Sequence, residues 1–401
     1  MKKICTLVLA ILAVFSFAGC KNDDNPAVVT DPVTEPPVSS VVTEPNENTD
    51  VTPVYENMYT VSLPVTEDAH NAEDGTLIFT YSYQTISPVH QDREVADKII
   101  LNFTDRIEKS RVDSQSILNL AKAQYTPGSN FSPLSYQIQY DVTRVDQGVL
   151  SLFGSVLQTS NSAGANRSLV AANYDMVTGD VLTVGSILYH IDTKDDLAQL
   201  VIDELKQRED IILFDEYPET VKARFEQDES IDEDFYFSNV GLCFYFAPYE
   251  IAPRSSGTII VEIPYNKLTG IIADAYFPAE RTHTVGTISC EVFQEIHWEQ
   301  YEQFPEVVAT PNATKLLLTT DSAVQDVRIF QLVLPEDSMM QAQAKNIFAA
   351  NVLAKENAII FEADLESATT DYMISYSVNG VTKTFRIAAD DTTGNIVLIA
   401  Q

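Results

Sequence analysis

Histidines and carboxylates are the side chains best suited to acid–base or metal chemistry, and this chain scatters both along its 401 residues. The five histidines do not pair at the spacing of metal ligands, so we expect surface or hydrogen-bonded residues. They are His70, His90, His190, His283 and His297. An acidic run at 228–234 offers the oxygen ligands that calcium prefers, but it lacks the glycine and the spacing of an EF-hand. We expect this run to be a solvated surface and the protein to bind no metal.

The common sequence motifs of catalysis are missing. The chain has no G-x-S-x-G elbow, no H-E-x-x-H motif, no Walker loop, no G-x-G-x-x-G loop and no paired cysteines at zinc spacing. We therefore expect no catalytic residue and no cofactor, which favours a non-enzymatic protein. A pair of catalytic carboxylates stays open as an alternative, because counting cannot single out two among 58 acids.

Four cysteines have different surroundings. Cys5 lies in an apolar leader, Cys20 stands at the end of that leader, and Cys243 and Cys290 belong to the remaining chain. Two cysteines are too few for a disulfide scaffold or for a structural zinc site with four ligands. They either pair with each other or form two separate thiols, and the apolar, strand-like surroundings of Cys243 favour separate thiols.

Cys20 has the surroundings that most clearly imply chemistry. Two lysines follow Met1, residues 4–17 are almost wholly apolar, and residues 17–20 read Phe-Ala-Gly-Cys. This pattern is typical of a secretory signal peptide and is too short for a transmembrane helix. It resembles the lipobox of bacterial lipoproteins, with phenylalanine in place of the usual leucine. The resemblance implies a signal peptide over residues 1–19 and diacylation of Cys20, for example with palmitate.

Lipidation at Cys20 predicts an extracytoplasmic protein that is lipid-anchored to the cell membrane. Each buried CH2 of the acyl chains contributes about 0.8 kcal/mol to the anchoring. An ordinary signal peptide with a chance cysteine, or an uncleaved anchor, is the alternative. The charged and proline-rich residues directly after Cys20 favour lipidation over both.

The mature chain is strongly acidic. Removal of residues 1–19 leaves 23 basic and 58 acidic residues, a formal charge of −35. Such a surface repels nucleic acid and anionic lipid, and it attracts cations and basic proteins. Solubility at a crowded cell surface is a simpler explanation of the same charge.

A linker precedes the folded region. Residues 21–55 contain six prolines, five threonines and seven acids, with no aromatic residue before Tyr55. Such a segment has too little apolar area to offset the entropy of ordering. We predict a disordered linker over residues 20–57 that spaces the folded region from the membrane.

Residues 58–280 have the pattern of an α+β domain, with an antiparallel sheet and two or three helices. Alternating apolar residues predict strands, and apolar residues at four-residue spacing predict helices. The predicted strands are 77–83, 136–142, 149–157, 235–246 and 258–263, with a hairpin at 173–184 around Thr178-Gly179-Asp180. The predicted helices are one through Val95, Ile99, Phe103 and Ile107, and one capped by Thr193.

Two sets of residues in this domain resemble a known family. The first set is Tyr136 to Tyr140 with Asn173-Tyr174-Asp175 and Thr178-Gly179-Asp180; the second is Gly241 to Phe246 with Tyr249-Glu250-Ile251-Ala252-Pro253 and Gly257. Together they resemble the extracytoplasmic domain shared by RsiV anti-sigma factors and PdaC-type peptidoglycan deacetylases. We expect Tyr249 to Pro253 of the second set to form a rigid corner between strands. The chain shows no cytosolic sigma-binding segment and no deacetylase domain, so neither relative's full activity follows.

The last part of the chain has an all-β pattern. A connector over residues 281–305 contains His297 and the single tryptophan, Trp298. Six strand-like segments in residues 306–401 predict a small β-sandwich, and Asn379-Gly380 predicts a hairpin turn. The segments are 315–319, 327–334, 358–363, 372–378, 382–388 and 395–399. We expect this sandwich to fold alone.

These features favour a non-enzymatic binding or sensing lipoprotein of the cell envelope. The family resemblance implies that its partner is a basic protein such as lysozyme, a muramidase, or cell-wall material such as peptidoglycan. The acidic charge argues against nucleic acid as a partner. Two alternatives stay open: a cell-wall hydrolase that uses paired carboxylates, and a structural envelope protein.

Overall fold

The computed structural model describes residues 58–89, 92–160, 164–227, 231–279, 284–294, 304–333, 343–390 and 395–401. The predicted signal peptide, lipidation site and linker lie outside these ranges, as do His90, His283, His297, Trp298 and the acidic pair 228–229. No helix in the described ranges is long and apolar enough to cross a membrane. The fold combines helices with mainly antiparallel sheets, and strands predominate, in agreement with the predicted α+β class followed by a β-sandwich.

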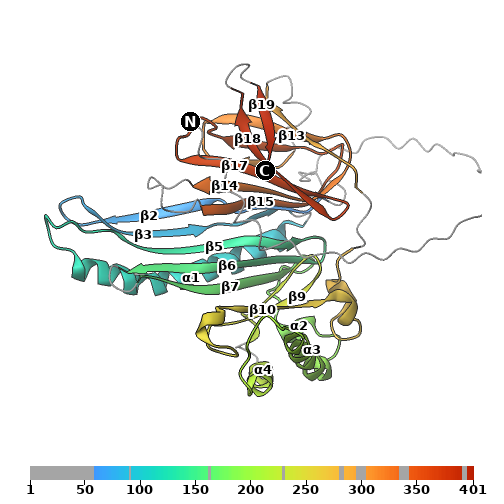
Figure 1. Cartoon of the computed structure of the whole chain (residues 1–401). Coiled ribbons are helices and arrows are strands. Elements are labelled where there is room, and N and C mark those ends of the chain that lie inside the picture. The colour runs from blue at the N-terminus through green and yellow to red at the C-terminus, as the bar shows by residue number, and fades with distance from the viewer. Residues whose placement is uncertain are drawn as a thin grey trace, which may run out of the picture. The chain divides into compact units, whose positions relative to one another are not determined.

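A five-stranded sheet with one long helix beside it forms the first part of the fold (Figure 1). The strands, in spatial order, are β2 (Val65–Asn71), β3 (Leu77–Gln84), β5 (Leu134–Val145), β6 (Val149–Ser160) and β7 (Gly164–Asp175). The helix α1 (Arg93–Gln124) connects β3 to β5, which pair in parallel. Inward-facing residues of β3 and β5 share one apolar core with α1, as the alternation predicted.

Helix α1 begins directly after a capping residue, Asp92, and continues beyond the apolar row that predicted it. The Oδ1 atom of Asp92 accepts a hydrogen bond from the amide of Glu94 at 2.8 Å, which caps the first turn. The predicted apolar row is buried, and small or apolar residues extend the same face through Ser110, Ser114, Leu118 and Ala121. Because serines interrupt that extension, the apolar periodicity fades in the sequence before the helix ends.

A three-stranded sheet and three helices form the second part. The strands are β10 (Ile259–Pro264), β9 (Gly241–Phe246) and β8 (Phe235–Phe237), in that spatial order. The helices are α2 (Val184–Ile187), α3 (Lys194–Lys206) and α4 (Tyr217–Glu226). Their apolar faces bury a common core that includes Leu197, Val201 and Phe244.

The predicted hairpin at 173–184 was wrong in its second strand. Beyond β7 the chain makes an isolated bridge, Tyr174 with Val181, and then enters α2. The turn itself is as expected, since Gly179 has a φ of 73°. Its carbonyl accepts from Asn102 Nδ2 of α1 at 3.2 Å, and a Cβ at Gly179 would lie 2.8 Å from the Val95 carbonyl oxygen. Two backbone hydrogen bonds still join the arms of the turn, from the Asp175 amide to the Asp180 carbonyl at 2.9 Å and from the Leu182 amide to the Asn173 carbonyl at 2.8 Å. The turn also packs against α1, and the chain enters α2 before a second strand forms.

The prediction that the Thr193 hydroxyl caps a helix was wrong, although its position was right. Thr193 does occupy the N-cap position of α3, but its side chain accepts no capping hydrogen bond. Its Oγ1 donates instead to the carbonyls of His190 at 2.7 Å and Ile271 at 2.9 Å. The hydroxyl therefore ties the helix start to a distant loop.

Two sheets enclose the C-terminal core, as a sandwich requires. The four-stranded sheet has the order β11 (Ile288–Val292), β13 (Thr314–Thr320), β16 (Ile359–Ala363) and β12 (Glu306–Val308). The seven-stranded sheet has the order β19 (Ile396–Ala400), β18 (Val381–Ala389), β17 (Thr370–Val378), β14 (Val324–Val333), β15 (Gln343–Leu353), β1 (Thr60–Ser62) and β4 (Ser87–Val89). Side chains of both sheets share one core. Asn379 and Gly380 have φ values of 52° and 76° between β17 and β18, which confirms that hairpin.

Strands from outside the predicted sandwich complete both of its sheets. Strand β1 lies between β15 and β4, with Thr60 opposite Ala350. Strand β11, from the predicted connector, pairs with β13. Polar contacts reinforce the junction, since Gln84 Nε2 donates to the Asn346 carbonyl at 3.0 Å. The domain boundaries at 280 and 306 stay a prediction, but the segments on either side of them share sheets.

Candidate functional site

The side chains that the sequence singled out for chemistry do not converge. In the described ranges, no three His, Cys, Asp or Glu side chains group in a way that could hold a metal ion. Asp232 accepts from a backbone amide at 2.6 Å, whereas Asp234 pairs with Arg224, so these acids make separate contacts. His70 and His190 are exposed.

Cys243 and Cys290 are separate thiols, which decides between the two alternatives. Cys243 on β9 is buried, and its Sγ lies 3.5 Å from Oε1 of Glu262. Burial raises the pKa of both thiols, to about 12 for Cys290. Because the thiolate is the nucleophilic form, neither cysteine is activated at neutral pH.

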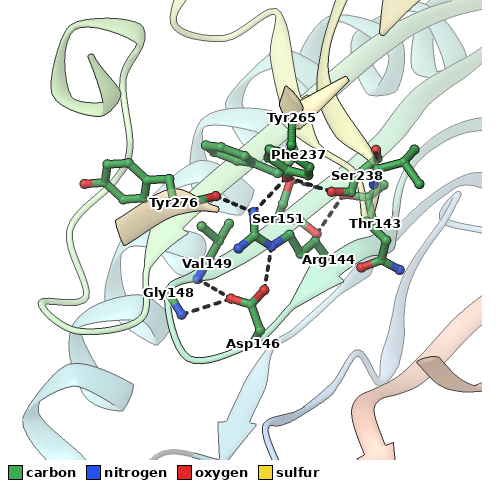
Figure 2. A network of polar contacts seen from close by, with 12 residues as sticks. Thr143, Arg144, Asp146, Gly148, Val149, Ser151, Phe237, Ser238, Tyr265 and Tyr276 are labelled. Carbon is green, nitrogen blue, oxygen red and sulfur yellow. Dashed lines mark hydrogen bonds and ion pairs between the residues drawn. The ribbon is translucent and has the colours of Figure 1, made fainter. Parts of the chain in front are cut away.

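The most prominent polar network surrounds a buried arginine at the end of β5 (Figure 2). Arg144 follows a register shift of β5 against β6, and its side chain is 1% exposed. Its Nε donates to Asp146 Oδ2 at 2.6 Å, and its Nη1 donates to Tyr265 Oη at 2.7 Å and to the Tyr276 carbonyl at 2.6 Å. A buried guanidinium requires such pairing to offset the loss of hydration.

The partners of this guanidinium are themselves held in place. Asp146 Oδ1 accepts from the amides of residues 148–149 at 2.9 and 3.0 Å, so the carboxylate also shapes the turn between β5 and β6. Tyr265 Oη donates to the Ser238 carbonyl at 2.8 Å. The guanidinium carbon lies 5.6 Å from the ring centre of Phe237 and 5.5 Å from that of Tyr265, within cation–π range.

A second set of polar contacts, beside this arginine, links the five-stranded sheet to the three-stranded sheet. Ser151 Oγ on β6 donates to Asn173 Oδ1 at 2.7 Å and accepts from the Phe237 amide at 2.9 Å. Asn173 Nδ2 on β7 donates to the Phe235 carbonyl at 2.8 Å. Asn173 belongs to the first set of family-like residues, and the structure gives it this cross-linking contact.

The network around Arg144 cross-links the fold. The guanidinium is protonated at all ordinary pH values. Burial raises the pKa of Tyr265, and burial with the charge of Asp175 raises that of Tyr276 to about 12. Both phenols are therefore neutral at physiological pH and act as hydrogen-bonding groups, not as bases.

Sequence reasoning missed Arg144, although a signal was present. Strand β5 alternates strictly, and Arg144 stands two residues after Val142 in the buried series. An arginine at such a position needs a carboxylate nearby, and Asp146 follows two residues later. The partners Tyr265 and Tyr276 lie more than 100 residues away, and no local pattern announces them.

Residues 249–253 of the second family-like set lie in the corner between β9 and β10, as predicted. Ile251 and Ala252 are buried at this corner, whereas the side chain of Tyr249 is 71% exposed. Tyr249 has a φ of 75°, a left-handed conformation that is a genuine outlier for a bulky residue. Holding a residue there costs about 1–3 kcal/mol, so the surroundings must impose it.

Glu250 imposes this conformation on the corner. Its Oε2 accepts from the Ala247 amide at 2.8 Å, and its other carboxylate oxygen pairs with Arg224 of α4. The backbone amide of Glu250 also donates to the Ala247 carbonyl at 3.1 Å. The corner is therefore closed by its own backbone and braced by a helix.

Comparisons with known proteins identify a domain in this region. Residues 180–266 match the family described as "Protein of unknown function (DUF3298)". A solved DUF3298 structure from Bacteroides fragilis NCTC 9343 is similar at 16% identity, with 54% of this chain and 94% of that chain covered and a TM-score of 0.36. Another, from Pseudomonas aeruginosa PAO1, is similar at 16% identity, with 55% and 97% covered and a TM-score of 0.34. No curated protein matches the chain. The finer resemblance to RsiV-type and PdaC-type proteins stays a prediction, and the chain contains a DUF3298 domain over residues 180–266.

Proposed function

We propose that this chain is a lipid-anchored cell-surface protein whose ectodomain binds a basic, cell-wall-directed protein, with lysozyme-like muramidases as the specific candidate. The observation that carries the proposal is a concentration of acid in the DUF3298 domain. Residues 209–219 contain five carboxylates and no lysine or arginine, and all five side chains are exposed. They are Glu209, Asp210, Asp215, Glu216 and Glu219.

The acidic charge explains fast association with a basic protein, but it does not explain why one basic protein would bind in preference to another. A mature surface of charge −35 steers basic proteins toward it, which raises the association rate at low salt. Any basic protein profits from that steering, so a specific partner must also keep affinity when the charges are screened. The resemblance to RsiV-type domains, which bind lysozyme, supports muramidases as that partner.

Calorimetry of the soluble chain from residue 21 onward with lysozyme tests this function. We expect a Kd in the micromolar range or tighter, which weakens with salt but does not vanish between about 0.01 M and about 1 M, where the Debye length falls from about 30 to about 3 Å. The control is a basic protein of similar size and charge that is not a muramidase. Absence of binding at tens of micromolar lysozyme, or equal binding of the control, removes muramidase recognition.

The anchoring part of the proposal has its own test. Because Cys20 supplies the proposed attachment, Cys20→Ser should release the protein into the medium or leave it as an unprocessed precursor. Fractionation of cells with immunoblotting and mass measurement of the N-terminus separates these forms. A normally processed Cys20→Ser chain that stays fully with the membrane contradicts the lipid anchor.

A further inference from the structure

We infer that Tyr249 is the centre of the contact surface through which the DUF3298 domain binds its basic partner. This inference rests on the proposed function and adds to it the residues that make the contact. The surface consists of Tyr249 at the β9–β10 corner together with Ile212 and Phe214 from the loop that precedes α4.

The backbone of Tyr249 is the first argument. The other non-glycine residues with positive φ in the described ranges are Asn312, Asp326 and Asn379, types that adopt this conformation readily. Tyrosine does not, and glycine would fit this corner with less strain. Its side chain is exposed and so adds little to the core. A residue that strains the backbone while facing solvent suggests selection for contact with a partner.

The neighbours of Tyr249 supply the second argument. The Phe214 ring lies edge-on to the Tyr249 ring, with centroids 5.5 Å apart and planes at 79°. The Phe214 amide donates to the Ile251 carbonyl at 2.9 Å, which fastens the loop to the corner. Ile212, two residues before Phe214, is 79% exposed. An exposed tyrosine whose ring is held against a second aromatic ring is of the residue type enriched in binding hot spots.

The charges around these apolar residues identify the occupant. Four of the five carboxylates of residues 209–219 lie within four residues of Ile212 or Phe214 in the chain: Glu209, Asp210, Asp215 and Glu216. Asp210 forms an ion pair with Arg208 at 2.7 Å, so the acidic character of the segment comes mainly from the other three. Exposed apolar side chains flanked in the chain by carboxylates complement a partner that presents apolar groups together with lysine and arginine. A basic globular protein has that chemistry, whereas a glycan strand supplies no ring of positive charge.

Substitutions at Tyr249 test the inference in the soluble chain, with lysozyme as the probe. Tyr249→Ala should raise the Kd at least about tenfold, as for a hot-spot residue, whereas Tyr249→Phe should stay within about threefold. Tyr249→Gly should raise the Kd as much as Tyr249→Ala, yet leave Tm unchanged or higher, because glycine relieves the strained φ. Ile212→Ser should also weaken binding.

The matched control is Tyr189→Ala. Tyr189 is an exposed tyrosine of the same domain, 57% accessible, with its ring edge-on to His190 at a centroid distance of 4.8 Å. We expect its Kd to stay within about twofold of that of the unaltered protein. If the unaltered chain binds lysozyme and Tyr249→Ala binds equally well, this surface is wrong and the proposed function stands. If Tyr249→Gly lowers Tm by several degrees, Tyr249 serves folding, and the inference is wrong. If the unaltered chain does not bind lysozyme, the proposed function and this surface are removed together.

Discussion

Replacing Arg144 with methionine should lower the free energy of unfolding by about 3–5 kcal/mol, the range for breaking a buried ion pair by removing one partner. Methionine keeps most of the aliphatic volume but donates no hydrogen bond. Asp146 then loses its cation, and the carbonyl of Tyr276 and the hydroxyl of Tyr265 lose their donor. Because Asp146 lies in the β5–β6 turn, whereas Tyr265 and Tyr276 lie in short 3-10 helices after β10, the loss should loosen the attachment of the DUF3298 domain to β5.

The size of this effect depends on burial, and a surface pair provides the control. Arg386 donates to Asp371 Oδ1 at 2.7 Å, but the arginine side chain is 46% exposed. Arg386→Met should cost about 0–1 kcal/mol, because water replaces the lost partner. Arg144→Lys should fall between the two, since an ammonium keeps the charge without the planar fork that reaches three partners.

Chemical denaturation followed by circular dichroism measures these differences, with the linear slope checked for a single transition. A double-mutant cycle with Asp146→Asn isolates the pair, because the asparagine Oδ1 can still accept from the amides of residues 148–149. If Arg144→Met shifts the midpoint no more than Arg386→Met does, the buried network contributes little to stability. Its function would then lie elsewhere than in joining the sheets.

Elements that depend on residues close together in the sequence were predicted, whereas those that depend on distant parts of the chain were missed. Strands β3 and β5 were predicted because their apolar residues alternate, and β6 was predicted because its segment is apolar and rich in strand-forming residues. The hairpin at Asn379-Gly380 was predicted because two adjacent positive φ values demand those residue types. Strand β15 was missed: its alanines, at 344, 349 and 350, are typical of helix, and its position between β14 and β1 overrides that preference.

The candidate binding surface was less accessible to sequence reasoning than the strands. The corner at Tyr249 to Pro253 was predicted correctly, but nothing in the sequence indicated the φ of 75° at Tyr249. Phe214 meets that tyrosine from 35 residues earlier in the chain, and the ring contact depends on the folded path of both segments. Only the acidic character of residues 209–219 was visible beforehand, as part of the overall charge.

A chain that starts at Glu306 should fail to fold cooperatively, in contrast to the expectation that the sequence alone supports. It lacks β11, which pairs with β13, and β1, which pairs with β15. It also lacks three buried apolar side chains of the sandwich core, those of Met58, Ile288 and Phe304. Each contributes about 1.5–3 kcal/mol when fully buried, or about 5–9 kcal/mol together. A domain of this length has a net stability of only about 5–14 kcal/mol.

Two longer chains make this expectation measurable. A chain from residue 284 regains β11 with Ile288 and Phe304, and we expect partial recovery; a chain from residue 58 also regains β1 and should melt cooperatively. Without β1, the backbone of β15 opposite Thr60 to Ser62 is left as an open edge, which promotes aggregation. Thermal melts by circular dichroism and size-exclusion chromatography compare the three chains. A monomeric 306–401 chain with a sharp melt would show that the sandwich is autonomous, and that β1 and β11 only dock on a sheet already formed.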